Sequence, residues 1–89
     1  MSMEENLKYI VSVLSGEKST RLMQVENKLS FVVSKDSNKI LIKKEVEALL
    51  KAKVESINII NRMDSRKVAI VKLKPEYQAM DIATQLGLI

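Results

Sequence analysis

Residues 54–73 read VESINIINRMDSRKVAIVKL, and this stretch decides the fold class of the chain. Two runs rich in β-branched residues, 54–61 and 67–73, are typical of strands. Only residues 62–66 separate these runs, and that length is too short for the crossover that parallel strands require. The stretch therefore predicts an antiparallel hairpin with a short turn.

The segment before this hairpin predicts a further strand and the clearest helix of the chain. Residues 28–34 alternate apolar and polar side chains, so we expect a strand that carries Leu29, Phe31 and Val33 on one face. Residues 39–51 follow a turn in which Ser37 or Asn38 can cap a helix. Their apolar side chains form one helical stripe, which consists of Ile42, Val46, Leu49 and Leu50. Glu47 and Lys51 have the spacing of an i,i+4 ion pair.

The two ends of the chain are less strongly patterned. Residues 7–14 fit a short strand or a helical turn equally well, whereas residues 17–27 predict a short helix that Ser15 can cap. Residues 81–86 predict a final helix that Gly87 ends in a left-handed conformation. The whole pattern predicts a single α+β domain over residues 1–89: a small antiparallel sheet of three to four strands with helices packed on it.

Composition excludes several classes of function. The chain has 89 residues and contains no Cys, His or Trp, which excludes a structural zinc site, a disulfide scaffold and a Ser-His or Cys-His nucleophile. No apolar run approaches the ~18–20 residues that cross a bilayer. The first residues include Glu4 and Glu5 without a basic cluster, so no signal peptide is expected. We expect a cytoplasmic protein with no cofactor, metal, membrane partner or small-molecule substrate.

Positive charge is concentrated in the middle of the chain. The formal net charge is +4, but residues 28–53 carry +4 and residues 54–74 carry +3, between two acidic ends. With a sequence pI of about 9.4, a polyanionic partner is a reasonable expectation. The alternative is that the lysines only solvate helix and strand surfaces.

A catalytic role has little support in the sequence. Glu45 and Glu47 are two residues apart on the predicted helix and do not face each other, so they are a poor acid–base pair. No glycine-rich phosphate loop is present. An alternative to a nucleic-acid partner is a small protein–protein adaptor with an incidental basic face, whose binding would not weaken steeply with salt.

Several segments resemble one ribosomal protein family, and they occur in order from about residue 14 to the end. They are EKS at 17–19, ENKL at 26–29, FVV at 31–33, NK at 38–39, IKK at 42–44, VE at 46–47, KVE at 53–55 with Asn58, VKLKPEY at 71–77, DIA at 81–83 and LG at 86–87. Their ordered sum is similar to the large-subunit ribosomal protein family numbered twenty-three, in its short archaeal-type form. Residues 1–13 do not align. The turn near Asp64 is too short for the long loop by which bacterial members reach the polypeptide exit tunnel.

The resemblance implies a structural constituent of the large ribosomal subunit that binds rRNA near the exit tunnel. It further implies contact with neighbouring ribosomal proteins and a docking surface for nascent-chain factors such as the signal recognition particle. Binding of this kind rests on cations that neutralise phosphates. The candidate rRNA-binding residues are Lys18, Lys39, Lys43, Lys44, Asn58, Arg62, Arg66 and Lys67.

Two further candidates have alternative interpretations. Asn58 can hydrogen-bond RNA or an adjacent turn. Glu17 is the candidate for factor docking, but it also lies in the first helical turn, where the helix dipole stabilises a carboxylate. Among the aromatic residues, Phe31 is expected in the core and Tyr77 on the end of the sheet, while Tyr9 has no assigned place.

Overall fold

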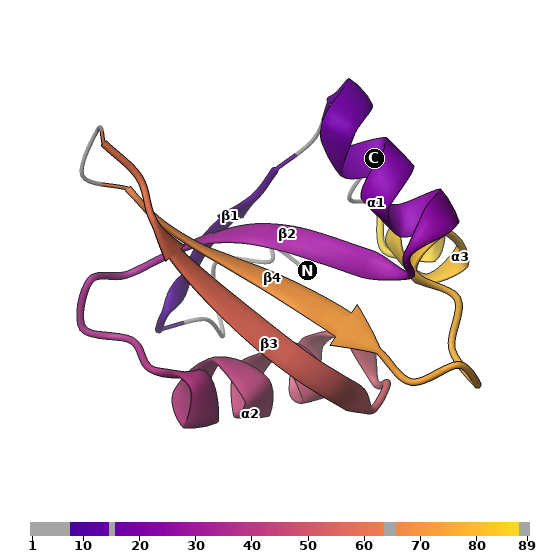
Figure 1. Ribbon diagram of the computed structural model, residues 1–89. Helices are drawn as coiled ribbons and strands as arrows, with labels where there is room; N and C mark the ends of the chain where they lie inside the picture. Colours follow the sequence, from indigo (N-terminus) through magenta and orange to yellow (C-terminus); the bar gives the residue numbers. More distant parts are fainter. Residues whose placement is uncertain (1–7, 15, 64–65, 88–89) are drawn as a thin grey trace.

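The computed structural model describes residues 8–14, 16–63 and 66–87. Within them, one antiparallel sheet has the strand order β1-β2-β4-β3 (Figure 1). The strands are β1 (Ile10–Val13), β2 (Lys28–Val33), β3 (Val54–Asn61) and β4 (Lys67–Leu73). The helices are α1 (Glu17–Val25), α2 (Lys39–Leu50) and α3 (Ala79–Gln85). The predicted α+β class is confirmed.

The predicted hairpin is confirmed, and its register is well defined. Asn61 pairs with Lys67 next to the turn, and Val54 pairs with Leu73 at the far end. A β-bulge between Val54 and Ser56 shifts the register at that end. The N-terminal half of the hairpin, β3, is an edge strand, whereas β4 lies in the interior of the sheet next to β2.

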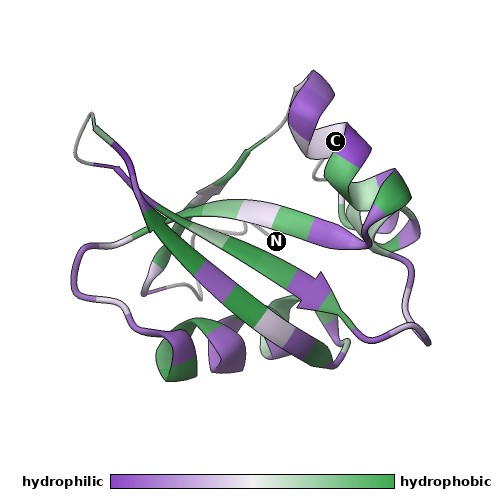
Figure 2. Cartoon of the chain, in the orientation of Figure 1, coloured by the Kyte–Doolittle hydropathy of each residue, from purple (hydrophilic) through white to green (hydrophobic). Residues whose placement is uncertain are grey.

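All three helices pack on one face of the sheet. The strand residues of this face include Leu29, Phe31 and Val71, which are fully buried. One cluster joins them to buried helix residues, namely Met23 of α1, Ile42, Val46 and Leu50 of α2, and Ala79 and Ala83 of α3. Figure 2 accordingly shows green, hydrophobic residues along β2 and β4 and alternating colours along α2. Of the described elements, none covers the opposite face, which we call the open face.

The structure corrects several predicted boundaries. The opening segment forms a strand, whose Ile10 pairs with Val33. The first helix ends at Val25 instead of residue 27, because Asn27 adopts a left-handed conformation with φ 58°. The last helix begins at residue 79 instead of 81. Asn38 caps α2 by accepting from the Leu41 amide at 3.0 Å. Gly16 occupies the cap of α1, and Ser15 lies outside the described residues.

Candidate nucleic-acid interface

The end of the β3–β4 hairpin carries a cluster of cations. Arg62 and Arg66 are exposed, and the Arg62 amide donates to the Arg66 carbonyl at 2.8 Å, which closes the turn. With Asn61, Lys67 and Lys35 they line a hollow of about 350 Å³. Two arginines and two lysines thus surround one small space, an arrangement that favours an anion. We call these four residues the hairpin cluster.

Lys67 has a structural contact within this cluster. Its ammonium nitrogen donates to the Ser37 carbonyl at 2.6 Å and to the Lys35 carbonyl at 3.4 Å. These bonds join the start of β4 to the loop that precedes α2, and they explain why Lys67 is half-buried. Neutral carbonyls leave its positive charge in place, so Lys67 still adds to the local potential. Lys35 was not a predicted site residue, because only the folded loop brings it to the hairpin.

The three candidate lysines of α2 are exposed but do not all point the same way. Ile42, Val46 and Leu50 face the core, and the candidates lie outside this stripe. Successive helical residues are about 100° apart, so Lys43 and Lys44 point in clearly different directions. The structure therefore brings Lys43 near the C-terminal end of β4, where it lines a second hollow with Lys74, and directs Lys44 away from it.

The remaining candidates lie on other parts of the surface. Glu17 and Lys18 are exposed in the first turn of α1. Asn58 is exposed on the open face, where it pairs with Ile70 of β4. Its side chain has no hydrogen-bond partner within the described part of the chain, so the adjacent-turn alternative finds no support there. In Figure 1 the hairpin end and the pair formed by α1 and α3 lie at opposite ends of the molecule.

The two carboxylates considered as a catalytic pair have separate structural contacts. The Glu45 carboxylate accepts from the amides of Lys8, Tyr9 and Ile10, with bonds of 3.0–3.1 Å from Tyr9 and 3.0 Å from Ile10. Glu47 accepts from the amide of Val54 at 3.1 Å. Each carboxylate therefore holds the start of an edge strand against α2. The predicted Glu47–Lys51 ion pair is absent among the described residues, because Glu47 turns to β3.

The aromatic residues offer no exposed stacking surface. Phe31 is fully buried in the core, as predicted. Tyr77 is half-buried and packs against the core cluster at the end of the sheet, as predicted. Tyr9, which had no assigned place, is half-buried at the entry to β1, where its carbonyl accepts from the Ser34 amide at 2.7 Å. None of these three side chains therefore provides an exposed platform for base stacking.

A small α+β domain whose exposed cations gather at one end of the sheet is typical of proteins that contact nucleic acid through its phosphate backbone. The sequence model of the family described as ribosomal protein L23 matches residues 8–81. The chain therefore belongs to the ribosomal protein L23 family, as the resemblance implied, and is a structural protein of the large ribosomal subunit in the cytoplasm.

A curated relative agrees with this assignment. The large ribosomal subunit protein uL23 of the archaeon Thermoplasma acidophilum is 46% identical over 78 residues, which cover 88% of this chain and 92% of the relative. The family match begins at residue 8 and so includes β1, which lies in the segment that the sequence resemblance left unaligned. None of the helices in the described residues is long and apolar enough to cross a membrane.

Proposed function

We propose that the chain binds large-subunit rRNA beside the opening of the polypeptide exit tunnel and has a structural, non-catalytic role there. The observation that carries the rRNA contact is the hairpin cluster, in which four cations surround one hollow of about 350 Å³. Cations gathered around one hollow raise the local positive potential and attract a polyanion. A row of phosphates supplies such anions without any requirement for base sequence.

The position beside the tunnel rests on the family resemblance and on the length of the hairpin turn. Residues 62–66 separate the last paired residues of β3 and β4. A five-residue turn that doubles back reaches roughly 9 Å beyond the strands, at ~3.5 Å per extended residue. The hairpin cluster therefore touches rRNA locally and does not extend into the tunnel.

The proposed partners also include neighbouring ribosomal proteins and nascent-chain factors such as the signal recognition particle. Glu17 supports the second of these, because its carboxylate is exposed at the start of α1, far from the hairpin cluster. A charge-assisted pair with a cation of the factor would orient the factor on the ribosome. Glu17 also lies in the first turn of α1, whose cap is a glycine without a side chain, so a helix-dipole role is the alternative.

A salt titration tests the rRNA contact. The Arg62→Gln, Arg66→Gln double variant should lower the slope of log K against log salt by about 1.4–1.8 units, at ~0.7–0.9 per lost phosphate contact. The matched control is Lys28→Gln, Lys72→Gln, which removes the same charge from one pair of β2 and β4 residues at the end of the sheet away from the hairpin turn. Equal slopes for both variants would remove the hairpin cluster from the interface. Salt-independent binding would favour the adaptor alternative.

A further inference from the structure

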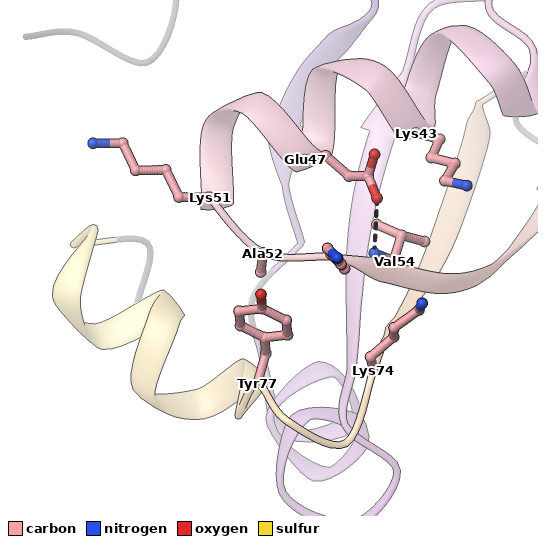
Figure 3. A pocket seen from close by; sticks show the side chains of 8 residues that line it. Lys43, Glu47, Lys51, Ala52, Val54, Lys74 and Tyr77 are labelled. Atoms are coloured by element: carbon pink, nitrogen blue, oxygen red, sulfur yellow. Dashed lines mark hydrogen bonds between the residues drawn. The ribbon is translucent and has the colours of Figure 1, made fainter.

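A second hollow lies where the end of α2, the start of β3 and the end of β4 meet (Figure 3). Its volume is about 450 Å³, and it opens widely to solvent. Four lysines line it together with Glu47 and Tyr77, and we call them the lysine hollow: Lys43, Lys51, Lys53 and Lys74. Only Lys43 belongs to the rRNA candidates derived from the sequence.

The hairpin register forces two of these lysines together. The amide of Lys74 donates to the carbonyl of Lys53 at 3.1 Å, one step beyond the Val54–Leu73 pair. Two lysines at neighbouring positions on antiparallel strands repel each other. In Figure 3, Lys43 and Lys74 approach the hollow from α2 and from the end of β4. Lys51 lies at its outer rim, and its side chain extends away from the other labelled side chains.

Among the lining residues, a single acid opposes the charge of the four lysines. Glu47 is the only carboxylate that lines the hollow, and it accepts from the Val54 amide at 3.1 Å. The Lys28–Glu26 and Lys72–Glu55 ion pairs do not involve a lysine of the hollow. The formal charge of the lining is therefore strongly positive.

The backbone of Lys51 provides an independent observation. Lys51 ends α2 in the left-handed region with φ 53° and ψ 40°, a position where glycine or asparagine is favoured. Its amide donates to the Glu47 carbonyl at 3.0 Å, so this end of the helix is well defined. A glycine would make the same backbone bond without strain. A lysine held there instead adds a cation to the rim of the hollow, which indicates a use for the charge.

We propose that the lysine hollow binds the sugar–phosphate backbone of large-subunit rRNA, as a second contact separate from the hairpin cluster. This inference rests on the proposed function. The two sites lie at opposite ends of β3, whose eight residues span roughly 26 Å at ~3.3 Å per residue. Lys43 lies in α2, and the other three lysines adjoin the end of α2, the start of β3 and the end of β4, so the cations come from separate segments that a chain of phosphates could follow.

Tyr77 adds a polar group suited to RNA. Its hydroxyl points toward Ala52 in the hollow (Figure 3) and has no hydrogen-bond partner among the described residues. A phenol hydroxyl donates to a phosphate oxygen or accepts from a ribose 2′-hydroxyl. An acidic segment of a neighbouring protein would use the lysines but would not require this second kind of contact.

The test compares two charge-matched double variants in salt titrations of binding to transcribed large-subunit rRNA. Lys53→Gln, Lys74→Gln removes two cations of the hollow from neighbouring positions, directly before β3 and directly after β4. Lys28→Gln, Lys72→Gln removes two that face each other across β2 and β4 but already engage carboxylates. The first variant should lower the salt slope by about 1.4–1.8 units, and the control by less than half a unit.

A third variant guards against loss of folding. Lys51→Gly relieves the left-handed strain, so its melting temperature should equal or exceed that of the wild type, while its slope falls by about 0.7–0.9 units. If wild type binds rRNA and the slopes of both hollow variants are unchanged, the hollow is not an RNA site, although the proposed function stands. If wild type itself fails to bind rRNA, the proposed function fails as well. Unchanged rRNA slopes, with loss of a neighbouring protein from purified subunits, would assign the hollow to an acidic protein segment and overturn the inference.

Discussion

Substitution of Asn27 should destabilise the fold more than any other change of a half-buried polar side chain. Asn27 follows α1 with φ 58°, and its side-chain amide donates to the Tyr77 carbonyl at 2.7 Å. Its side-chain oxygen accepts from the Ala79 amide, also at 2.7 Å, at the first residue of α3. One side chain thus joins the end of α1, the end of β4 and the start of α3.

The magnitude follows from these contacts. Each of the two short hydrogen bonds contributes about 1 kcal/mol, and the Ala79 amide is left without a partner in a fully buried residue. A β-carbon without a local hydrogen bond in the left-handed region costs roughly 1 kcal/mol more. We therefore expect Asn27→Ala to lower the free energy of unfolding by about 3 kcal/mol. At ~4–8 °C per kcal/mol for a domain of this size, the melting temperature falls by about 12–24 °C.

Thermal unfolding followed by circular dichroism measures both the hydrogen-bond contribution and the backbone contribution of Asn27. Asn27→Gly removes the same hydrogen bonds but tolerates the left-handed conformation, so it should melt roughly 4–8 °C above Asn27→Ala. A decrease of less than about 4 °C for Asn27→Ala would refute the role of the two hydrogen bonds. Identical melting temperatures for the Ala and Gly variants would refute the backbone argument.

Three further predictions concern the carboxylates and α2. Glu45→Ala removes charge-assisted hydrogen bonds to three amides, so it should lower the free energy of unfolding by about 2 kcal/mol. Amide hydrogen exchange should become faster at the start of β1 but not in β4. An equal increase in exchange rate in both strands would contradict this role. The Lys39→Ala, Lys43→Ala, Lys44→Ala variant should reduce the salt slope of rRNA binding by about two to three units, and an unchanged slope removes these three lysines of α2 from the site. Glu17→Gln should weaken factor binding to ribosomes with stability intact if Glu17 docks factors; a lower melting temperature with normal binding would assign it to the helix dipole instead.

The predictability of the fold from sequence followed the length of each pattern. The hairpin and α2 were predicted with nearly correct bounds because β-branched runs and an apolar stripe extend over seven or more residues. The end of α1 and the start of α3 were not predicted correctly, because Asn27 determines both boundaries through contacts with residues about 50 positions away. The strand β1 was ambiguous in sequence, and its start is held by Glu45 of α2, which no local pattern reveals.

The candidate site was predictable only where the cations are near in sequence. Arg62, Arg66 and Lys67 adjoin one turn, so their proximity follows from the hairpin alone. Lys35 joins them only through the folded loop before α2. Counting back from the turn places Lys74 opposite Val54, and only the β-bulge, which the sequence does not reveal, brings Lys74 opposite Lys53.

Photo-crosslinking from position 63 tests the central claim most directly. Met63 is fully exposed in the hairpin turn, beside the hairpin cluster, so a photoreactive amino acid there should not disturb the core. In purified ribosomes carrying a nascent chain, we expect the crosslink to form with large-subunit rRNA and not with the nascent chain, because the turn is too short to reach the tunnel. A crosslink to the nascent chain, or only to another protein, would contradict the account.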